Sequence, residues 1–134
     1  MSLKPMFVLF LVLCVSVVNA EGLNYTFTDG KLTGTETIAA TGYIELHFQN
    51  NNDQPYDIAI DRLKEGKTPA DLEVATASVA EAFTTNPEKI PEATKIDYET
   101  SETIGGVSAA PNASATAGVL LGPGIYVISP SCGG

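Results

Sequence analysis

The most restrictive feature of this sequence is a strict alternation of apolar and polar side chains in the stretch YIELHFQ, residues 43–49. Its three aliphatic or phenyl side chains fall on one side of an extended chain, and His47 falls on the other. Successive side chains of a β-strand point to opposite faces, so this run is typical of an antiparallel strand with one buried face. The stretch YDIAIDRL, residues 56–63, repeats the pattern with Ile58 and Ile60. We therefore expect a core built between β-sheets.

Further short β-prone runs, separated by turn residues, indicate a mainly β protein. The last two of them flank Gly122-Pro123-Gly124 and are expected to form a hairpin. The runs are residues 23–28, 35–39, 104–107, 119–121 and 125–128, with a short strand also expected at Lys95 to Tyr98 in an otherwise polar connection.

One helix is expected between the strands, at about residues 69–84. Thr68 can cap its start, and Pro69 suits the first helical position. Leu72, Val79 and Phe83 then recur at helical spacing before Asn86-Pro87 ends the run.

Residues 1–20 have the pattern of a secretory signal peptide. Lys4 precedes an apolar run, and small residues lead to a cleavage point after Ala20. The apolar run, roughly 13 residues, is shorter than the ~20 needed to cross a bilayer. We expect one domain at residues 21–134, secreted to an extracellular or periplasmic space, with no membrane span after signal cleavage.

The chain is acidic, with 16 Asp and Glu against 7 Lys and Arg and a net charge of −9. Nucleic acid and anionic lipid are poor partners for such a surface. Cys132 is the only cysteine outside residues 1–20, so it can form a disulfide only between chains. Asn24 and Asn112 begin the two Asn-x-Ser/Thr sequons, which are potential glycosylation sites.

The residues also argue against an enzyme. The single histidine, His47, lies on a polar strand face, and Cys132 has no base or cation beside it in sequence. Asp57 and Asp61 share a strand face, but four residues at ~3.3 Å each separate them by about 13 Å, too far for a glycosidase pair. No catalytic residues are expected.

Several features follow one another in an order that resembles a known family. The runs TIAATGYIELHFQNNNDQPYDIAIDRLKEGKTPADL and GGVSAAPNASATAGVLLGPGIYVIS are similar to small cupredoxin-like domains of the plastocyanin and azurin type. The resemblance implies a Greek-key β-sandwich with the helix inserted between strands. The pieces that carry it are Gly42 to Asn50, Arg62-Leu63, Gly66-Lys67-Thr68, Gly105-Gly106 and Leu121 to Tyr126.

Blue-copper members of this family bind the metal through two His, one Cys and usually one Met. This chain has Pro55-Tyr56-Asp57 where the first His would stand, and Cys132 lies two residues later than the family's Cys. One His and one Cys cannot supply such a site, so the resemblance implies a protein without metal or other cofactor. The alternative is a copper-binding or electron-transfer protein with an incomplete or intermolecular site, using His47 and Cys132.

We therefore expect a secreted, metal-free cupredoxin-like module with a binding or structural role. The resemblance points to the end of the sandwich where the family binds metal. The strand at residues 125–128 is also expected to have an open edge that accepts a strand from a protein partner or a second copy. The residues expected at the binding end are Asn50, Asn51, Asn52, Tyr56 and Asp57.

Overall fold

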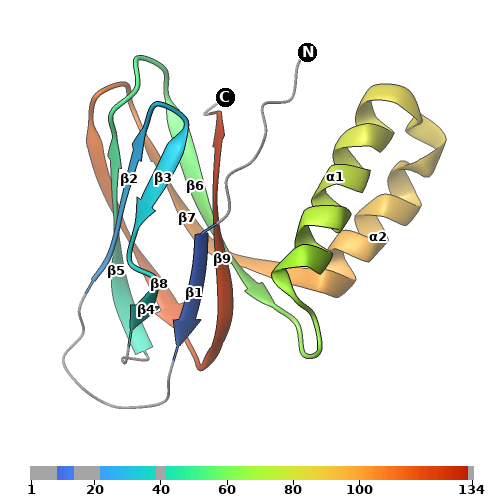
Figure 1. The fold of residues 1–134 in the computed structure, drawn as a ribbon, viewed down its shortest axis with the longest axis horizontal. Helices are drawn as coiled ribbons and strands as arrows, with labels where there is room; N and C mark the ends of the chain where they lie inside the picture. Colours follow the sequence, from blue (N-terminus) through green and yellow to red (C-terminus); the bar gives the residue numbers. More distant parts are fainter. Residues whose placement is uncertain (1–8, 14–21, 39–41, 133–134) are drawn as a thin grey trace.

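The computed structural model describes residues 9–13, 22–38 and 42–132, which form two β-sheets with a pair of helices beside them (Figure 1). Sheet A has the strand order β4-β1-β9-β6-β7, and sheet B has the order β3-β2-β5-β8. The expectation of a mainly β protein is confirmed. The strands are β1 (Leu9–Leu13), β2 (Leu23–Thr28), β3 (Lys31–Gly34), β4 (Thr37–Ile38), β5 (Gly42–Asn50), β6 (Tyr56–Leu63), β7 (Ser101–Ala109), β8 (Ser114–Leu121) and β9 (Gly124–Cys132); the helices are α1 (Pro69–Thr85) and α2 (Ile90–Thr100), joined by the 3₁₀ turn Pro87–Lys89.

An apolar core lies between the two sheets. The alternating residues of β5 in sheet B are fully buried, and so are Ile58 and Ile60 of β6 in sheet A. Because side chains from both sheets join one cluster, the sheets pack face to face as a β-sandwich. The buried members of the cluster are Leu23, Tyr25, Phe27, Leu32, Ile44, Leu46, Phe48, Ile58, Ile60, Ala109, Val119, Leu121, Tyr126 and Ile128.

The expected hairpin between the last two strands is wrong. β8 pairs with β5 in sheet B, whereas β9 pairs with β6 and β1 in sheet A, so the turn at Gly122 carries the chain from one sheet to the other. Tyr126 holds this crossover, because its buried hydroxyl donates to the carbonyl of Gly122 at 2.8 Å and accepts from the Gly122 amide at 3.2 Å.

The expected helix is confirmed as α1, and its start has a complete capping box. The Thr68 hydroxyl accepts from the Asp71 amide at 3.2 Å, and the Asp71 carboxylate accepts from the Thr68 amide at 2.8 Å. Leu72 is buried as expected, but Phe83 is 63% exposed and its neighbour Ala82 is buried instead. The helix therefore packs through a smaller face than the apolar periodicity predicts.

A second helix, α2, replaces the connection expected after α1, so the prediction of one helix and of a short strand at Lys95–Tyr98 is wrong. Pro91 lies in its first turn, where a proline is tolerated because that amide needs no partner within the helix. Its buried residues are Ala93 and Thr100, and most of its other side chains are polar, which is why the sequence predicts a connection there.

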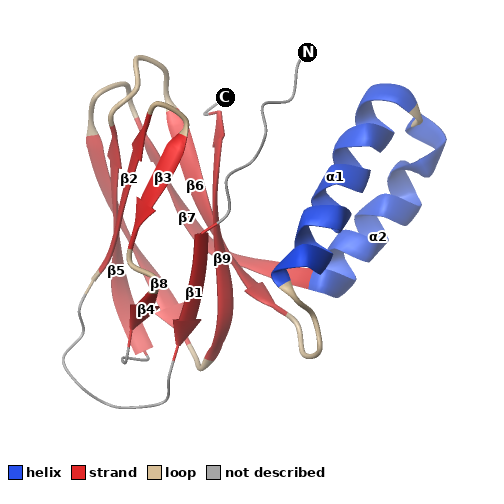
Figure 2. Ribbon diagram, viewed as in Figure 1, coloured by secondary structure: helices blue, strands red, loops and turns tan. Residues whose placement is uncertain are grey.

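The two helices lie side by side and stand to one side of the strands (Figure 2). A small cluster of Leu63, Leu72 and Val127 connects the start of α1 to the outer face of sheet A. Of the run expected as a strand at residues 35–39, residues 37 and 38 form β4, whereas Thr35 and Glu36 precede it outside any strand. Residue 39 lies outside the described ranges.

Candidate functional site

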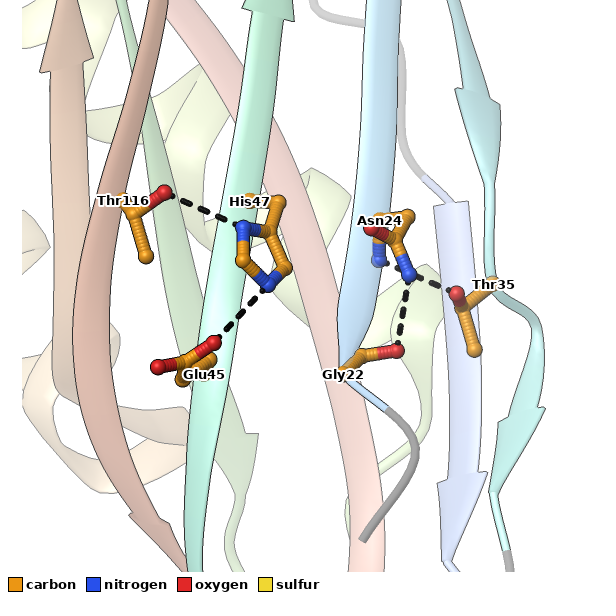
Figure 3. A network of polar contacts seen from close by, with 6 residues as sticks. All are labelled: Gly22, Asn24, Thr35, Glu45, His47 and Thr116. Atoms are coloured by element: carbon orange, nitrogen blue, oxygen red, sulfur yellow. Dashed lines mark hydrogen bonds and ion pairs between the residues drawn. The ribbon is translucent and has the colours of Figure 1, made fainter.

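His47 lies on the outer face of sheet B within a surface network of polar side chains (Figure 3). Its Nδ1 is 3.0 Å from the hydroxyl of Thr116, and its Nε2 is 3.2 Å from the carboxylate of Glu45. Both ring nitrogens therefore have partners, and the side chain is 41% exposed. The expected outward orientation of His47 is what the strand alternation produces.

The structure does not bring His47 and Cys132 together. Cys132 is an exposed free thiol at the end of β9 in sheet A, opposite Tyr56, whereas His47 faces away from the core on sheet B. Packed sheets lie ~10 Å apart, and metal–ligand bonds are about 2 Å long, so the two side chains of one chain cannot share an ion. Across the described ranges, no group of three or more His, Cys, Asp or Glu side chains is arranged to hold a metal.

The three asparagines expected at the binding end hold the loop after β5 in place. Asn50 is fully buried, and its amide donates to the carbonyls of Gln54 at 2.8 Å, Ala110 at 3.1 Å and Ala109 at 3.2 Å. Its side-chain oxygen accepts from the backbone and side chain of Asn52, at 3.1 and 3.0 Å. A buried amide needs such partners, so the role of Asn50 is structural.

The neighbouring residues of that end are also engaged. The Asn51 side chain donates to the Thr28 hydroxyl at 3.0 Å, and the Asn52 side chain donates to the Phe27 carbonyl at 3.0 Å. The Tyr56 ring packs edge to face against Phe27 with a centroid distance of 4.8 Å. Asp57 lies between Ser108 of β7 and Ser131 of β9 in sheet A.

A cleft that sequence reasoning missed lies between the helices and the outer face of sheet A. Its volume is about 550 Å³. Asp61 of β6 and Asp97 of α2 both line it, and the Thr103 hydroxyl donates a hydrogen bond to Asp61. The lining residues, none of which is histidine or cysteine, are Ala59, Asp61, Leu72, Thr76, Asp97, Tyr98, Ser101, Glu102, Thr103, Ser129, Pro130 and Ser131.

The surroundings of this cleft raise the pKa of two of its carboxyls. Burial raises the pKa of Asp61 above its usual range, against the opposing effect of the Thr103 hydrogen bond. Burial also raises the pKa of Asp97, and the nearby negative charge of Asp61 raises it further. Among the residues that line the cleft, no histidine base and no cysteine nucleophile accompanies the two carboxyls. The sequence carried no signal for the pair, because Asp97 lies on the helix that periodicity did not predict.

The edge of β9 is the other feature that can bind a partner. In sheet A, β1 lies between β9 and β4 (Figure 1). It pairs antiparallel with β9 from Leu9 opposite Ile128 to Leu13 opposite Gly124, and parallel with β4. β1 lies within residues 1–20, the segment that the sequence predicts to be a signal peptide. The strand beside β9 is thus supplied by residues expected to be removed.

The two sequon asparagines lie at exposed positions. Asn24 is on β2, where its side chain donates to the Gly22 carbonyl at 3.0 Å (Figure 3). Asn112 is in the turn between β7 and β8 and has a positive φ of 54°, a conformation that asparagine tolerates.

Comparison of the chain with models of protein families and with curated proteins found no match to either.

Among the described helices, none has both the length and the apolar character required to cross a bilayer.

Proposed function

We propose that this protein is an exported, metal-free cupredoxin-like module that binds a partner or has a structural role, without catalytic activity. Residues 1–20 serve as the signal peptide, and residues 21–134 form the mature domain with a Greek-key arrangement of strands. The order of the sequence features that resemble the cupredoxin-like family supports this assignment, as does the two-sheet architecture.

The observation that carries the proposal is the position of β1. Removal of residues 1–20 takes away the strand paired with β9, and leaves β9 with one unpaired edge between Gly124 and Ile128. An unpaired edge presents a row of amide and carbonyl groups that another strand can pair with. The mature domain therefore has a binding surface made of backbone groups.

The proposed function involves no metal ion because the possible metal ligands lie apart. His47 and Cys132 lie on different sheets, and both His47 ring nitrogens have protein partners. A copper-carrying protein remains the second candidate only as an intermolecular site, since exposed Cys132 could meet His47 of another copy.

Expression of the full chain with export, followed by intact mass and N-terminal sequencing of the product, tests the proposal. The expected product begins at Glu21, and titration with Cu(II) produces neither an intense blue colour nor stoichiometric metal binding. A product that retains residues 9–13 would contradict the open edge. An intense blue colour would favour the copper-binding alternative.

A further inference from the structure

We propose that a pocket beside the start of α1 binds the phosphate or sulfate group of a small molecule. The pocket has a volume of about 470 Å³ and lies where β6 leads into the helix pair (Figure 1). Arg62, Lys64 and Lys67 all line it, and we call it the basic pocket. Small-molecule sites commonly have volumes of about 300–1,000 Å³. All the lining residues lie outside residues 1–20, so this inference does not depend on removal of that segment.

The basic pocket gathers positive charge in an acidic protein. The chain has 7 Lys and Arg against 16 Asp and Glu, yet Arg62, Lys64 and Lys67 line this one pocket. Its acidic lining residues are Glu65 and Glu102. Within the described ranges, the ion pairs are made elsewhere, by Glu45 with His47 and by Glu99 with Lys95. No carboxylate is therefore paired with any of the three cations of the pocket.

A β-turn holds the two lysines of the basic pocket close to each other. The Lys67 amide donates to the Lys64 carbonyl at 3.0 Å, which closes the turn. The Cα atoms at the two ends of a β-turn are less than about 7 Å apart. Gly66 has a φ of 80° in this turn, a conformation that glycine adopts without strain. Two like charges held so near each other repel, and a bound anion would relieve that repulsion.

Both lysine side chains keep hydrogen-bond donors for a ligand. The Lys64 ammonium donates to the Tyr98 carbonyl, and an ammonium has three hydrogens, so two are left. Hydrogen bonds with Thr68 lower the pKa of Asp71, and the charge of Lys67 lowers it further. That carboxylate belongs to the capping box of α1 and does not line the pocket, so it does not occupy the site.

Arg62 provides the group best suited to an anion with several oxygens. Its Nη2 donates to the Pro123 carbonyl at 3.1 Å, which orients the guanidinium and uses one of five N–H donors. A side-chain carbon at Gly124 would lie 3.4 Å from Nε of Arg62, so the glycine leaves this edge of the guanidinium open. A planar guanidinium matches the oxygens of phosphate through two parallel hydrogen bonds.

The surrounding charge limits the ligand to a small molecule with one anionic group. The chain has a net charge of −9, so a polyanion that extended beyond the pocket would meet a repulsive surface. A phosphate or sulfate ester has three terminal oxygens, one for each cation, whereas a carboxylate has two. We therefore expect phosphate and sulfate to bind more tightly than a carboxylate.

Titration of the purified protein with inorganic phosphate, sulfate and acetate tests this inference. Sodium chloride keeps the ionic strength constant, and the backbone amide signals are followed by NMR spectroscopy. We expect saturable shifts at Gly66 and Gly124 with phosphate and sulfate, and binding of acetate at least about fivefold weaker. Acetate that binds as tightly as phosphate would overturn the assigned ligand class.

Matched variants locate the site, since each replaces an exposed side chain. Arg62→Gln and Lys67→Gln should each weaken phosphate binding by at least about fivefold. Arg62→Lys keeps the charge but loses the planar donor pair, so it should also weaken binding. The control Lys31→Gln removes the same charge from β3 of the other sheet and should leave binding unchanged. An equal effect of Lys31→Gln would show a response to net charge alone and would overturn the site; circular dichroism establishes that all variants are folded.

The outcomes of this titration are separate from those of the proposed function. The absence of saturable shifts with both phosphate and sulfate, or shifts confined to residues outside the basic pocket, would overturn this inference. Neither result bears on the start of the exported product or on its response to Cu(II), which test the proposed function.

Discussion

Asn50→Ala is the sharpest test of whether the asparagines after β5 maintain the fold or serve a ligand. The buried Asn50 side chain uses its two amide hydrogens on three carbonyls and its oxygen on two donors of Asn52. A hydrogen bond contributes roughly 1 kcal/mol net, and an orphaned buried acceptor costs about 1–3 kcal/mol. Some partners keep other contacts, since the Ala110 carbonyl also accepts from the Ala113 amide. The variant should therefore lose about 3 kcal/mol of unfolding free energy.

Urea unfolding of residues 21–134, followed by circular dichroism, measures this loss. A decrease of about 3 kcal/mol corresponds to a melting temperature lower by roughly 10 °C for a domain of this size. Asn51→Ala is the matched control; the Asn51 side chain is exposed, and its removal should cost less than about 1 kcal/mol. If Asn50→Ala is no more destabilised than Asn51→Ala, the structural role assigned to Asn50 is wrong.

Three further predictions concern the sheets and the cleft. Because burial raises the pKa of Asp61, the folded state holds its proton more tightly than the unfolded chain, so this group's contribution to stability falls as pH rises through the raised pKa. Asp61→Asn should therefore raise the unfolding free energy of the domain at neutral pH and weaken its dependence on pH at acidic pH. Urea unfolding at several pH values measures both effects. A variant that is less stable than the original domain at neutral pH would contradict this prediction. Gly106→Ala should lower the unfolding free energy by about 1–3 kcal/mol, because the added carbon would lie 2.6 Å from the Ile58 carbonyl oxygen. Gly122→Ala is the control and should be tolerated, since the nearest atom to its added carbon is 4.0 Å away. Equal melting temperatures of the two variants would refute the close contact at Gly106. Cys132 is exposed, so a thiol reagent should modify it fully without denaturant, and protection of the thiol in the native domain would count against its placement.

The strands and the first helix could be predicted because their signals are local. The alternation in residues 43–49 and 56–63 identified both faces of β5 and β6, and Thr68 with Pro69 identified the start of α1. The second helix could not be found in the same way. The segment that forms α2 is polar, and prolines lie at positions 87 and 91; both features favour a connection when only the sequence is considered.

The candidate sites were predicted less well than the elements. The loop of asparagines was predicted as a binding end, but the hydrogen bonds of buried Asn50 are made to carbonyls of β7 and the following turn, 59 and 60 residues away. The cleft was missed because it needs Asp97 on α2 to face Asp61 on β6. No spacing within the sequence connects these two residues.

The sequence by itself determined the strand faces, the cap of α1, the acidic surface and the shortage of metal ligands. These properties depend on residue identity or on neighbours within a few positions. Only the tertiary structure decided that the turn at Gly122 crosses between sheets, that two carboxyls share a cleft, and that Leu9–Leu13 lies beside β9. Such pairings join residues far apart in the chain, so they depend on how whole elements pack against one another, which local periodicity does not encode.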